Sequence, residues 1–547
     1  MTQRASRPDR AGPSAPDGRP SGHDAFWNPQ LSRRDALRLG ALGVAGAAGL
    51  GSLSGCAAVP QPAPAGAAQR RGGVYSHGAT GGGLKDTLDP HFPVTNPDIC
   101  RVFNLYEPLL RWNNSYEVEP AVAESVETTD AITWTVRLRE GVEFHNGKTV
   151  TPEDVLHTLA TVTDPNNTSP GGVPIAAVLD LANSRARDAR TIELRLKTPY
   201  AIFDQLIAEY TVGIIPTDFD LANPVGTGPF KADRFVPGQL SHFLRHDNYW
   251  ERPAFVDELF VYNFADDAAK VNALLAGQVQ SVDNLPTYLA HTIGNQGATA
   301  LVAEAGAWVP FTMRVDVAPF SDVRVRQALR LIVDRQQMID QALNGYGSIA
   351  NDLYAPFDPG YAHDLPQRTR DIDQARSLLR QAGQSDLQVE LVTSSGVGAG
   401  AVESANLFVE QAREAGVSVR LNRADPNTFY GEQYLSWPFA QDFWNTRNYL
   451  PQVSSSSLPS SPYNETHFND PEFIDIVTRA GQEVDDNRRY ELQRQAQEIE
   501  WNRGGFIIWG FRNQVDAYSN LTTGLKPHRY MPCDAFGFKN VSFVQEA

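Results

Sequence analysis

Residues 132–155 read ITWTVRLREGVEFHNGKTVTPEDV and predict a strand, a turn and the start of a helix in immediate succession. Ile132–Leu138 alternates apolar and polar side chains, which is typical of a strand with one buried face. A turn bounded by two glycines follows. Thr151 can cap a helix, and Pro152 with two acidic residues behind it suits the first helical turn. The stretch therefore predicts a strand that leads directly into a helix.

The same alternation of strands and helices continues on both sides of this stretch. Gly73–His77 predicts a first strand, and Asp371 caps a predicted helix that runs through Leu379. Ser454–Ser457, followed by two prolines, predicts a low-complexity loop. Because helices and strands alternate to the end of the chain, we expect α/β construction.

Length and composition limit the classes of protein that the chain can belong to. At about 150 residues per domain, 547 residues predict about three to four structural units. A hydrophobic fraction of 41% excludes global disorder. With 47 basic and 64 acidic residues, the net charge of -17 gives no electrostatic footprint for nucleic acid or anionic membranes. Only 3 cysteines are present, which excludes a disulfide-built scaffold and a multi-cysteine zinc or iron–sulfur domain.

Residues 1–55 are predicted to be an export signal. Arg33 and Arg34 stand ahead of the uncharged run Leu39–Leu53, which is too short for the roughly 20 residues that a bilayer span needs. A paired arginine before a short apolar segment indicates the twin-arginine secretion route.

The end of that signal predicts a lipid anchor. Small residues followed by Cys56 are typical of a bacterial lipobox, in which the cysteine becomes the diacylated first residue of the mature protein. Two acyl chains suffice for stable anchoring. Residues 56–71, rich in Pro and Ala, then predict a tether. We expect an exported protein, lipid-anchored to the outer face of the cytoplasmic membrane, in a periplasm or at the cell surface.

The sequence carries no recognisable catalytic or metal-binding motif. The sequence has no His-Glu-x-x-His and no Gly-x-Ser-x-Gly, and no Gly-Lys-Ser/Thr follows the glycines at 81–83. His242 and His246 stand four residues apart without a third ligand, so we expect a structural role for them. Since catalytic groups can also meet in space, the missing motifs alone do not exclude an extracellular hydrolase. We predict no metal site and no cofactor.

A series of short motifs occurs along the chain in a fixed order. The motifs are Asp89-Pro90-His91, Tyr106-Glu107-Pro108-Leu109-Leu110, Glu124-Ser125, Trp134, Leu138–Val142, Phe144–Gly147, Thr151–Val155, Gly226–Phe230, Asn248-Tyr249-Trp250, Pro319–Leu329 and Gly504-Gly505. In this order the chain resembles family 5 of the bacterial extracellular solute-binding proteins over essentially all of residues 72–545. These proteins are receptors of ABC importers for dipeptides, oligopeptides, nickel chelates and some sugars or opines.

The resemblance implies a two-lobe periplasmic-binding-protein (Venus flytrap) fold. Lobe one would comprise 72–303 with an inserted subdomain near 104–224, lobe two 304–505, and 506–547 would return to lobe one. Solute would be caught between the lobes and favour the closed form, which docks on the permease without covalent chemistry. We therefore expect a monomeric binding protein and no enzyme.

The segment Phe443–Tyr449 is the most informative about the solute. In peptide-binding relatives, an Asp three residues after a Trp pairs with the α-ammonium group of the peptide. Here Arg447 stands three residues after Trp444, and its planar guanidinium suits a carboxylate or phosphate. The departure predicts an acidic or polyol-containing solute, such as an opine-like conjugate, a sugar acid or an acidic peptide. The alternatives are an internal salt bridge of Arg447 or an alignment shifted by one residue.

Further solute contacts are expected from aromatic and amide side chains. Trp444 is either a stacking wall or a core residue, and Asn445 and Asn448 either bind hydroxyls and amides or belong to a plain loop. By the resemblance, Tyr430 and Trp437 would form aromatic walls, and Thr80 and Ser395 would lie at the cleft mouth on opposite lobes. We expect Trp134, Tyr249 and Trp250 in the core.

Two questions stay open at the level of sequence. Cys100 and Cys533 are either joined in a disulfide, which an exported protein permits, or two separate buried thiols. The leading function is a receptor that delivers a peptide or peptide-like solute to an ABC permease. The alternatives within the family are a receptor for an acidic non-peptide solute and one for a nickel or haem chelate, and outside importers a sensory receptor.

Overall fold

The computed structural model describes residues 69–544. The predictions on Arg33, Arg34 and Cys56 lie outside the described residues. Of the predicted tether, Gln69–Arg70 is described as β1, which pairs with β22 (Ser542–Val544) at the other end of the described chain. No helix within residues 69–544 is both long enough and apolar enough to cross a membrane.

The largest sheet defines what we call the first lobe. Its strand order is β13-β20-β12-β2-β11-β10-β9, with β15 also paired to β20. The chain-order neighbours β9, β10 and β11 are antiparallel, whereas β2 runs parallel to β11 and β12. The strands are β2 (Val74–Thr80), β9 (Phe230–Val236), β10 (Leu240–Arg245), β11 (Glu258–Phe264), β12 (Ser281–Val282), β13 (Ala298–Ala307), β15 (Gly347–Ile349) and β20 (Gly510–Ser519).

A four-stranded antiparallel sheet with its own core also belongs to the first lobe. It consists of β5 (Ala123–Thr128), β6 (Thr133–Leu138), β8 (Thr191–Leu196) and β7 (Leu179–Ala186), in that order. Its buried side chains fall between Leu109 and Ile214 and form one hydrophobic cluster. The strand, turn and helix predicted for residues 132–155 are confirmed here, because β6 leads to α3 (Pro152–Val162), which Thr151 caps together with Asp154.

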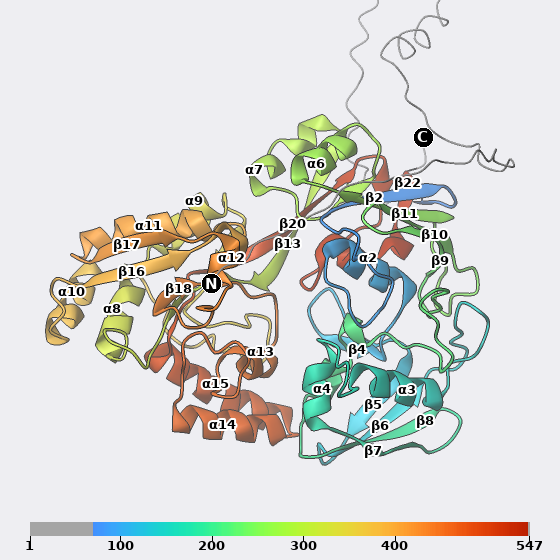
Figure 1. Ribbon diagram of the computed structural model, residues 1–547, viewed down its shortest axis with the longest axis horizontal. Helices are drawn as coiled ribbons and strands as arrows, with labels where there is room; N and C mark the ends of the chain where they lie inside the picture. The colour runs from blue at the N-terminus through green and yellow to red at the C-terminus, as the bar shows by residue number, and fades with distance from the viewer. Residues whose placement is uncertain (1–68, 545–547) are drawn as a thin grey trace, which may run out of the picture. The chain divides into compact units, whose positions relative to one another are not determined.

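A five-stranded sheet defines the second lobe. Its order is β17-β16-β18-β14-β19, from β17 (Ser418–Arg423), β16 (Gln388–Thr393), β18 (Phe439–Gln441), β14 (Phe311–Met313) and β19 (Phe506–Ile507). Figure 1 shows α8, α10 and α11 packed around this sheet and α13, α14 and α15 below it. The helices that accompany this sheet in the chain are α8 (Val323–Ile332), α9 (Arg335–Ala342), α10 (Ile372–Gln381), α11 (Ala401–Glu414), α12 (Pro426–Phe429), α13 (Tyr449–Ser456), α14 (Pro471–Gln482) and α15 (Asp486–Arg503).

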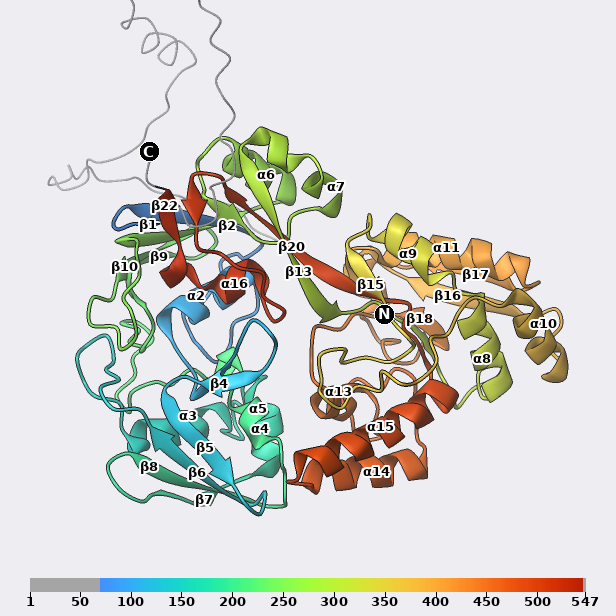
Figure 2. The same cartoon turned by 180° about the vertical axis from the view of Figure 1, so that it is seen from behind.

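The chain passes between the lobes through two neighbouring segments. β13 leads out of the first lobe into β14, and β19 leads back into β20. Both views show β13 and β20 running side by side toward the second lobe (Figure 1, Figure 2). Their register shifts between Ala303 and Ala307, where β13 places three residues opposite the single residue Asn513 of β20. The boundaries given above for the lobes and the inserted subdomain stay predictions.

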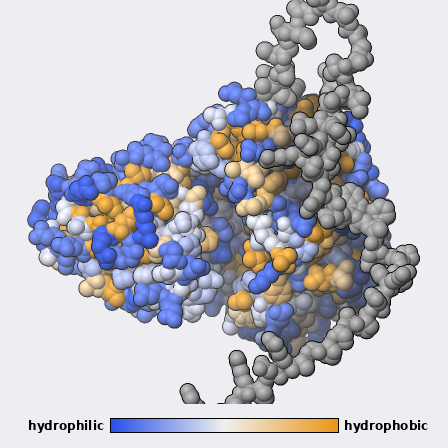
Figure 3. Space-filling view, turned by 45° about the horizontal axis from the view of Figure 1, so that its top comes forward, coloured by the Kyte–Doolittle hydropathy of each residue, from blue (hydrophilic) through white to orange (hydrophobic). Residues whose placement is uncertain are grey.

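On the surface seen in Figure 3, apolar side chains occur in small groups among hydrophilic ones.

The remaining elements of the first lobe complete the fold. The elements are α2 (Asn96–Leu105), β3 (Leu110–Trp112), β4 (Val118–Pro120), α4 (Gly172–Val178), α5 (Phe203–Leu206), η1 (Tyr210–Val212), α6 (Asp267–Leu275), α7 (Thr287–Ala290), η2 (Ile293–Gln296), β21 (Thr522–Thr523), α16 (Pro532–Phe536) and η4 (Phe538–Asn540).

One predicted loop is a helix in the structure. Ser454–Ser456 belong to α13, so the loop prediction is wrong for these residues. The three serine hydroxyls each donate to the carbonyl four residues earlier, at 3.0, 2.9 and 3.1 Å. The apolar face of α13 is buried through Leu450 and Val453. Burial of that face outweighs the weak helix preference of serine.

Both described cysteines are free in the structure. Cys100 lies in α2 and Cys533 in α16, and the two thiols are buried in the same hydrophobic cluster. Burial raises the pKa of both thiols well above the usual range. The structure thus matches the alternative of two separate buried thiols, which are poorly reactive because the thiolate is disfavoured.

Candidate functional site

Two hydrogen bonds join the lobes beside the segment Phe443–Tyr449. The Tyr116 hydroxyl of the first lobe donates to the Thr446 carbonyl oxygen at 2.9 Å. Asn448 Nδ2 donates to Gln205 Oε1 at 3.3 Å. The segment that the sequence singled out therefore lies where the two lobes meet.

Backbone hydrogen bonds hold this segment at both ends. Trp444 and Trp308 exchange two backbone hydrogen bonds of 2.9 Å each, directly after β18. At the other end, Asn448 is the N-cap residue of α13. Between them, the Gly306 N–H donates to Thr446 Oγ1 at 2.9 Å. The side chain of Arg447 thus projects from a backbone that is fixed on either side.

Arg447 carries a positive charge that the protein does not neutralise by an ion pair. Its guanidinium carbon lies 5.4 Å from the centroid of the Trp444 ring. Nη1 is buried and has no hydrogen-bond partner, and no salt bridge of Arg447 occurs among residues 69–544. A buried donor without a partner costs about 1–3 kcal/mol. The guanidinium therefore keeps a free hydrogen-bond donor for an anionic partner, in addition to the electrostatic attraction of Glu209 described below.

The first lobe presents an aromatic wall at this place. The rings of Trp112 and Tyr116 stack with centroids 4.4 Å apart and planes within 8°. The ring of Tyr530 lies 5.8 Å from that of Tyr116. Within the wall, the Glu209 carboxylate accepts hydrogen bonds from Trp112 Nε1 at 3.3 Å and from the Tyr530 hydroxyl.

Arg447 and Glu209 influence each other electrostatically across the lobe contact. Burial raises the pKa of Glu209, and the Tyr530 hydroxyl, the Arg447 charge and Trp112 oppose the rise. The Arg447 charge also lowers the pKa of Tyr116, which burial raises well above its usual range. The site therefore combines an unpaired cation on one lobe with an aromatic-lined carboxylate on the other.

A buried pair of acidic side chains lies behind Trp444. Asp442 accepts from the Tyr434 hydroxyl at 2.8 Å, and Glu465 accepts from Trp444 Nε1 at 3.1 Å. Burial and the neighbouring Asp442 raise the pKa of Glu465 well above its usual range. The raised pKa favours the uncharged form of Glu465.

The predicted residues of the 443–449 segment differ in exposure. Trp444 is only 7% exposed and packs against Trp308 in a core cluster, with one face toward Arg447. Asn445 is exposed and makes no side-chain hydrogen bond to the described residues. Asn448 is buried, and its Oδ1 has no partner. The structure thus places Trp444 mainly in the core, and brings Arg447 and Asn448 together at the lobe contact.

Tyr430 and Trp437 lie in a separate small cluster of the second lobe. The Tyr430 hydroxyl is buried without a partner, and its ring contacts those of Phe429 and Tyr434. Trp437 Nε1 donates to the Phe429 carbonyl at 3.3 Å. Because Tyr434 also binds Asp442, this cluster connects to the Trp444 region through side-chain contacts.

Thr80 and Ser395 are placed apart from the lobe contact by their own neighbours. The Thr80 hydroxyl donates to Asp267 Oδ1 at 2.6 Å, at the start of α6. Ser395 is exposed and opens a short turn after β16, with Gly396 beside Tyr430. No contact between described residues joins either side chain to the 443–449 segment.

Sequence reasoning missed the first-lobe half of the site. Tyr116, Glu209 and Tyr530 are far apart along the chain, and no local motif links them. The only nearby signal is the Tyr106–Leu110 motif, which leads into β3 with Trp112. Trp134 and Tyr249 are buried, and Trp250 packs against the same core, so the core assignment of these three is confirmed.

The described residues offer no metal centre. No group of three or more His, Cys, Asp and Glu within residues 69–544 is arranged to hold a metal ion. His242 is held by Asp233 and Glu258, each at 2.8 Å, and His246 is buried against the Gly228 carbonyl oxygen. Both histidines thus have structural partners of their own.

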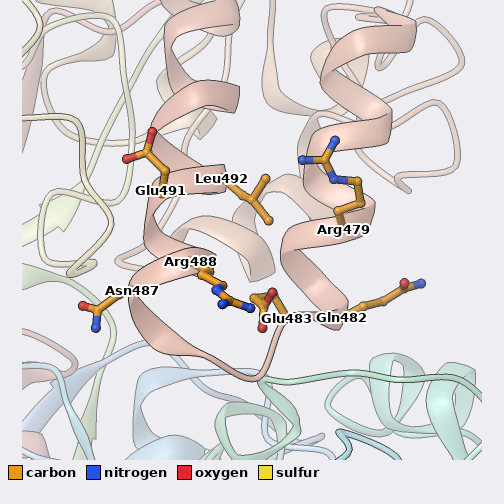
Figure 4. Close-up of a pocket in the computed structure, with 7 residues that line it drawn as sticks. All are labelled: Arg479, Gln482, Glu483, Asn487, Arg488, Glu491 and Leu492. Carbon is orange, nitrogen blue, oxygen red and sulfur yellow. The ribbon is translucent and has the colours of Figure 1, made fainter.

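A surface groove of about 660 Å³ lies between α14 and α15. Figure 4 shows the side chains that line it at the turn between these two helices. The lining consists of Arg479, Gln482, Glu483, Asn487, Arg488, Glu491 and Leu492. None of these residues takes part in the lobe contact around Arg447.

Comparisons of the sequence with protein families and with known proteins agree on one family. The family model described as bacterial extracellular solute-binding proteins, family 5 (middle part), matches residues 117–465. The glutathione-binding protein GsiB of Shigella flexneri is 23% identical over 480 residues, which cover 83% of this chain and 92% of that protein.

Two solved structures illustrate the shared fold. The periplasmic binding protein DppA of Helicobacter pylori, in complex with the peptide STSA, aligns with a TM-score of 0.71 at 20% identity. The binding protein AgaA of A. tumefaciens R10, in complex with agropinic acid, aligns with a TM-score of 0.71 at 22% identity. Each alignment covers 87% of this chain and 99% of the other. At these identities the likeness establishes the fold.

Proposed function

Because the chain belongs to family 5 of the bacterial extracellular solute-binding proteins, we propose that it binds a peptide or peptide-like solute carrying an acidic group. Proteins of this family are non-enzymatic components of ABC importers, which bind solute outside the cytoplasm and work with a permease. The observation that carries the proposal is the buried, unpartnered Nη1 of Arg447 at the lobe contact. A carboxylate of the solute would accept from this guanidinium in the bidentate geometry that arginine favours.

The opposite lobe supports a solute with more than one polar feature. Glu209 and the rings of Trp112, Tyr116 and Tyr530 face the same lobe contact from the other side. A solute held by Arg447 and by this wall would contact both lobes at once. Since it makes both sets of contacts only when the lobes are closed, it would stabilise the closed form.

The first test identifies the solute that the protein retains on purification. The protein is prepared natively and denatured, and the released small molecules are identified by mass spectrometry. An acidic peptide or peptide conjugate supports the proposal, and a non-peptide acid assigns the alternative within the family. A mixture of neutral and basic peptides without a common acidic group beyond the C-terminus contradicts a dedicated anion contact.

The role of Arg447 is then measured by calorimetry with the identified solute. Arg447→Ala removes a charge-assisted hydrogen bond worth about 1.5–3 kcal/mol, so affinity should fall at least about tenfold. Arg447→Lys should recover only part of the loss, because lysine keeps the charge without the planar fork. Arg413→Ala is the control, since Arg413 is exposed on α11 and pairs with Glu410. A change within about twofold for Arg447→Ala contradicts the proposed contact.

We also propose that the protein is a lipoprotein exported through Arg33 and Arg34 and anchored through Cys56. The support is the order of the paired arginine, short apolar run, small residues and cysteine. Cys56→Ala should release the protein from washed membranes into the soluble fraction. Retention of the Cys56→Ala protein on membranes contradicts the anchor.

A further inference from the structure

A cavity of about 220 Å³ lies inside the first lobe. The wall is formed by α2, the chain around β3 and the segment after Pro527. The lining residues used below are Asn104, Trp112, Ala208, Tyr530 and Asp534.

Asn104 lines this cavity and has an unused hydrogen-bond acceptor. The residue is 1% exposed. Its Nδ2 donates to the carbonyl oxygens of Cys100 at 2.8 Å and Phe536 at 3.2 Å, which fixes the orientation of the amide. Oδ1 then has no hydrogen-bond partner. Because a buried acceptor left unpaired costs about 1–3 kcal/mol, the cavity is suited to contents that donate a hydrogen bond.

The segment next to Asn104 in the wall is held in an unfavourable backbone conformation. Cys533, Asp534, Ala535 and Phe536 all have left-handed φ angles, between 50° and 62°. Such a conformation costs about 1–2 kcal/mol per non-glycine residue. It is held by the Cys533 N–H, which donates to Asp516 Oδ2 at 2.6 Å, and by Asn114 Nδ2, which donates to Asp534 Oδ1 at 3.0 Å. Backbone strain of this kind is typical of functional sites.

The charged groups around the cavity leave negative charge rather than positive charge available. Arg111 pairs with Glu119 and Glu251, and Lys539 also pairs with Glu251. By contrast, Asp534 accepts from the Asn114 amide and forms no salt bridge among the described residues, and the charges of Lys526 and Lys539 act on it only from a greater distance. Burial raises the pKa of Asp534 to about 6, so the carboxylate is still the main form at neutral pH.

Aromatic rings connect the cavity to the lobe contact. Trp112 and Tyr530 line the cavity, with ring centroids 6.0 Å apart, and the same two side chains donate to Glu209. Aromatic faces attract cations, most strongly when the site is shielded from water. An acceptor, a carboxylate and aromatic rings thus line one partly open cavity, and two of its rings also belong to the wall at the lobe contact.

We propose that this cavity binds a cationic nitrogen group of the solute, an ammonium or guanidinium, while Arg447 holds the acidic group. The inference rests on the proposed function and makes it more specific, because the solute then carries opposite charges at two points. Asn104 Oδ1 would accept from the nitrogen group, and Asp534 would supply the counter-charge.

The test uses methylguanidinium as a probe and N-methylurea as its neutral isostere. Crystals of the protein are soaked in each compound, and binding in solution is measured by the shift in melting temperature. We expect methylguanidinium in the cavity within hydrogen-bond distance of Asn104 Oδ1, and at least tenfold weaker binding of N-methylurea. Ordered water in place of both probes, or equal affinity for the two, overturns the proposal.

Two variants separate this cavity from the Arg447 contact. Ala208→Leu adds a side chain to the wall and should abolish methylguanidinium binding, and Ala208→Val serves where the leucine variant fails to fold. Arg447→Ala should leave methylguanidinium binding unchanged, because the probe has no acidic group, while it weakens binding of the natural solute. Loss of probe binding in Arg447→Ala but not in the Ala208 variants contradicts the cavity, whereas an unchanged solute affinity in Arg447→Ala contradicts the proposed function alone.

Discussion

Replacing Tyr116 with phenylalanine tests whether the lobe contact contributes to solute binding. The variant keeps the ring that stacks on Trp112 at 4.4 Å and removes only the hydroxyl that donates to the Thr446 carbonyl at 2.9 Å. A neutral hydrogen bond of this kind contributes about 0.5–1.5 kcal/mol net. Because the bond joins the two lobes, its loss lowers the stability of this arrangement relative to one in which the lobes have separated.

The expected result for Tyr116→Phe is a roughly 2- to 13-fold weaker affinity, which is that free energy converted at 25 °C. Calorimetry with the retained solute measures the affinity, and urea unfolding of the solute-free protein should show little change. Tyr288→Phe is the matched control, since Tyr288 is 68% exposed on α7 and lies outside the lobe contact. Unchanged affinity in Tyr116→Phe, or an equal loss in the control, would refute the role of this bond in closure.

Three further expectations concern stability. Burial raises the pKa of Glu500 from 4.5 to about 7, so the folded state favours its uncharged form. The free energy of unfolding should therefore fall by about 3 kcal/mol as the pH rises from about 4.5 to above 7. Glu500→Gln should remove this pH dependence in urea unfolding at pH 5 and pH 8, and an identical pH dependence in both proteins argues against it. Asp352→Asn should cost about 3–5 kcal/mol, because Asp352 is the buried partner of both Arg335 and Arg368 at 2.7 Å. Glu410→Gln, which breaks the exposed pair with Arg413, should cost at most about 1 kcal/mol, and equal losses in these two variants would contradict the effect of burial.

Secondary-structure elements that depend on residues close to one another along the chain were predictable from the sequence. The helix start at Thr151 is decided within four residues, since Thr151 and Asp154 satisfy each other's backbone N–H groups. The Ser454–Ser456 stretch misled the same reasoning, because its helix depends on burying Leu450 and Val453 in a distant core. Local patterns therefore predict caps and alternating strands, whereas the burial of a polar segment depends on what packs against it.

The candidate site was predictable only on one side. Arg447 stood out because the resemblance implies an acid three residues after Trp444, and the structure has Arg447 at the lobe contact. Tyr116 meets the same segment across 330 residues of chain, and no spacing or composition signals that meeting. The unpaired Asn104 Oδ1 could not be predicted from the sequence either. It is unpaired because the carbonyl groups of Cys100 and Phe536 fix the orientation of the amide.

The irregular pairing of β13 with β20 has a consequence for unloading. Gly306 lies among the extra residues of β13 and donates to Thr446 Oγ1, directly before Arg447. A rotation that changes the backbone at Gly306 must either break this bond or displace Arg447 with it. If the bond holds, a permease that forces the lobes apart would move Arg447 with β13 and withdraw its guanidinium from the proposed solute, so release would need no separate trigger.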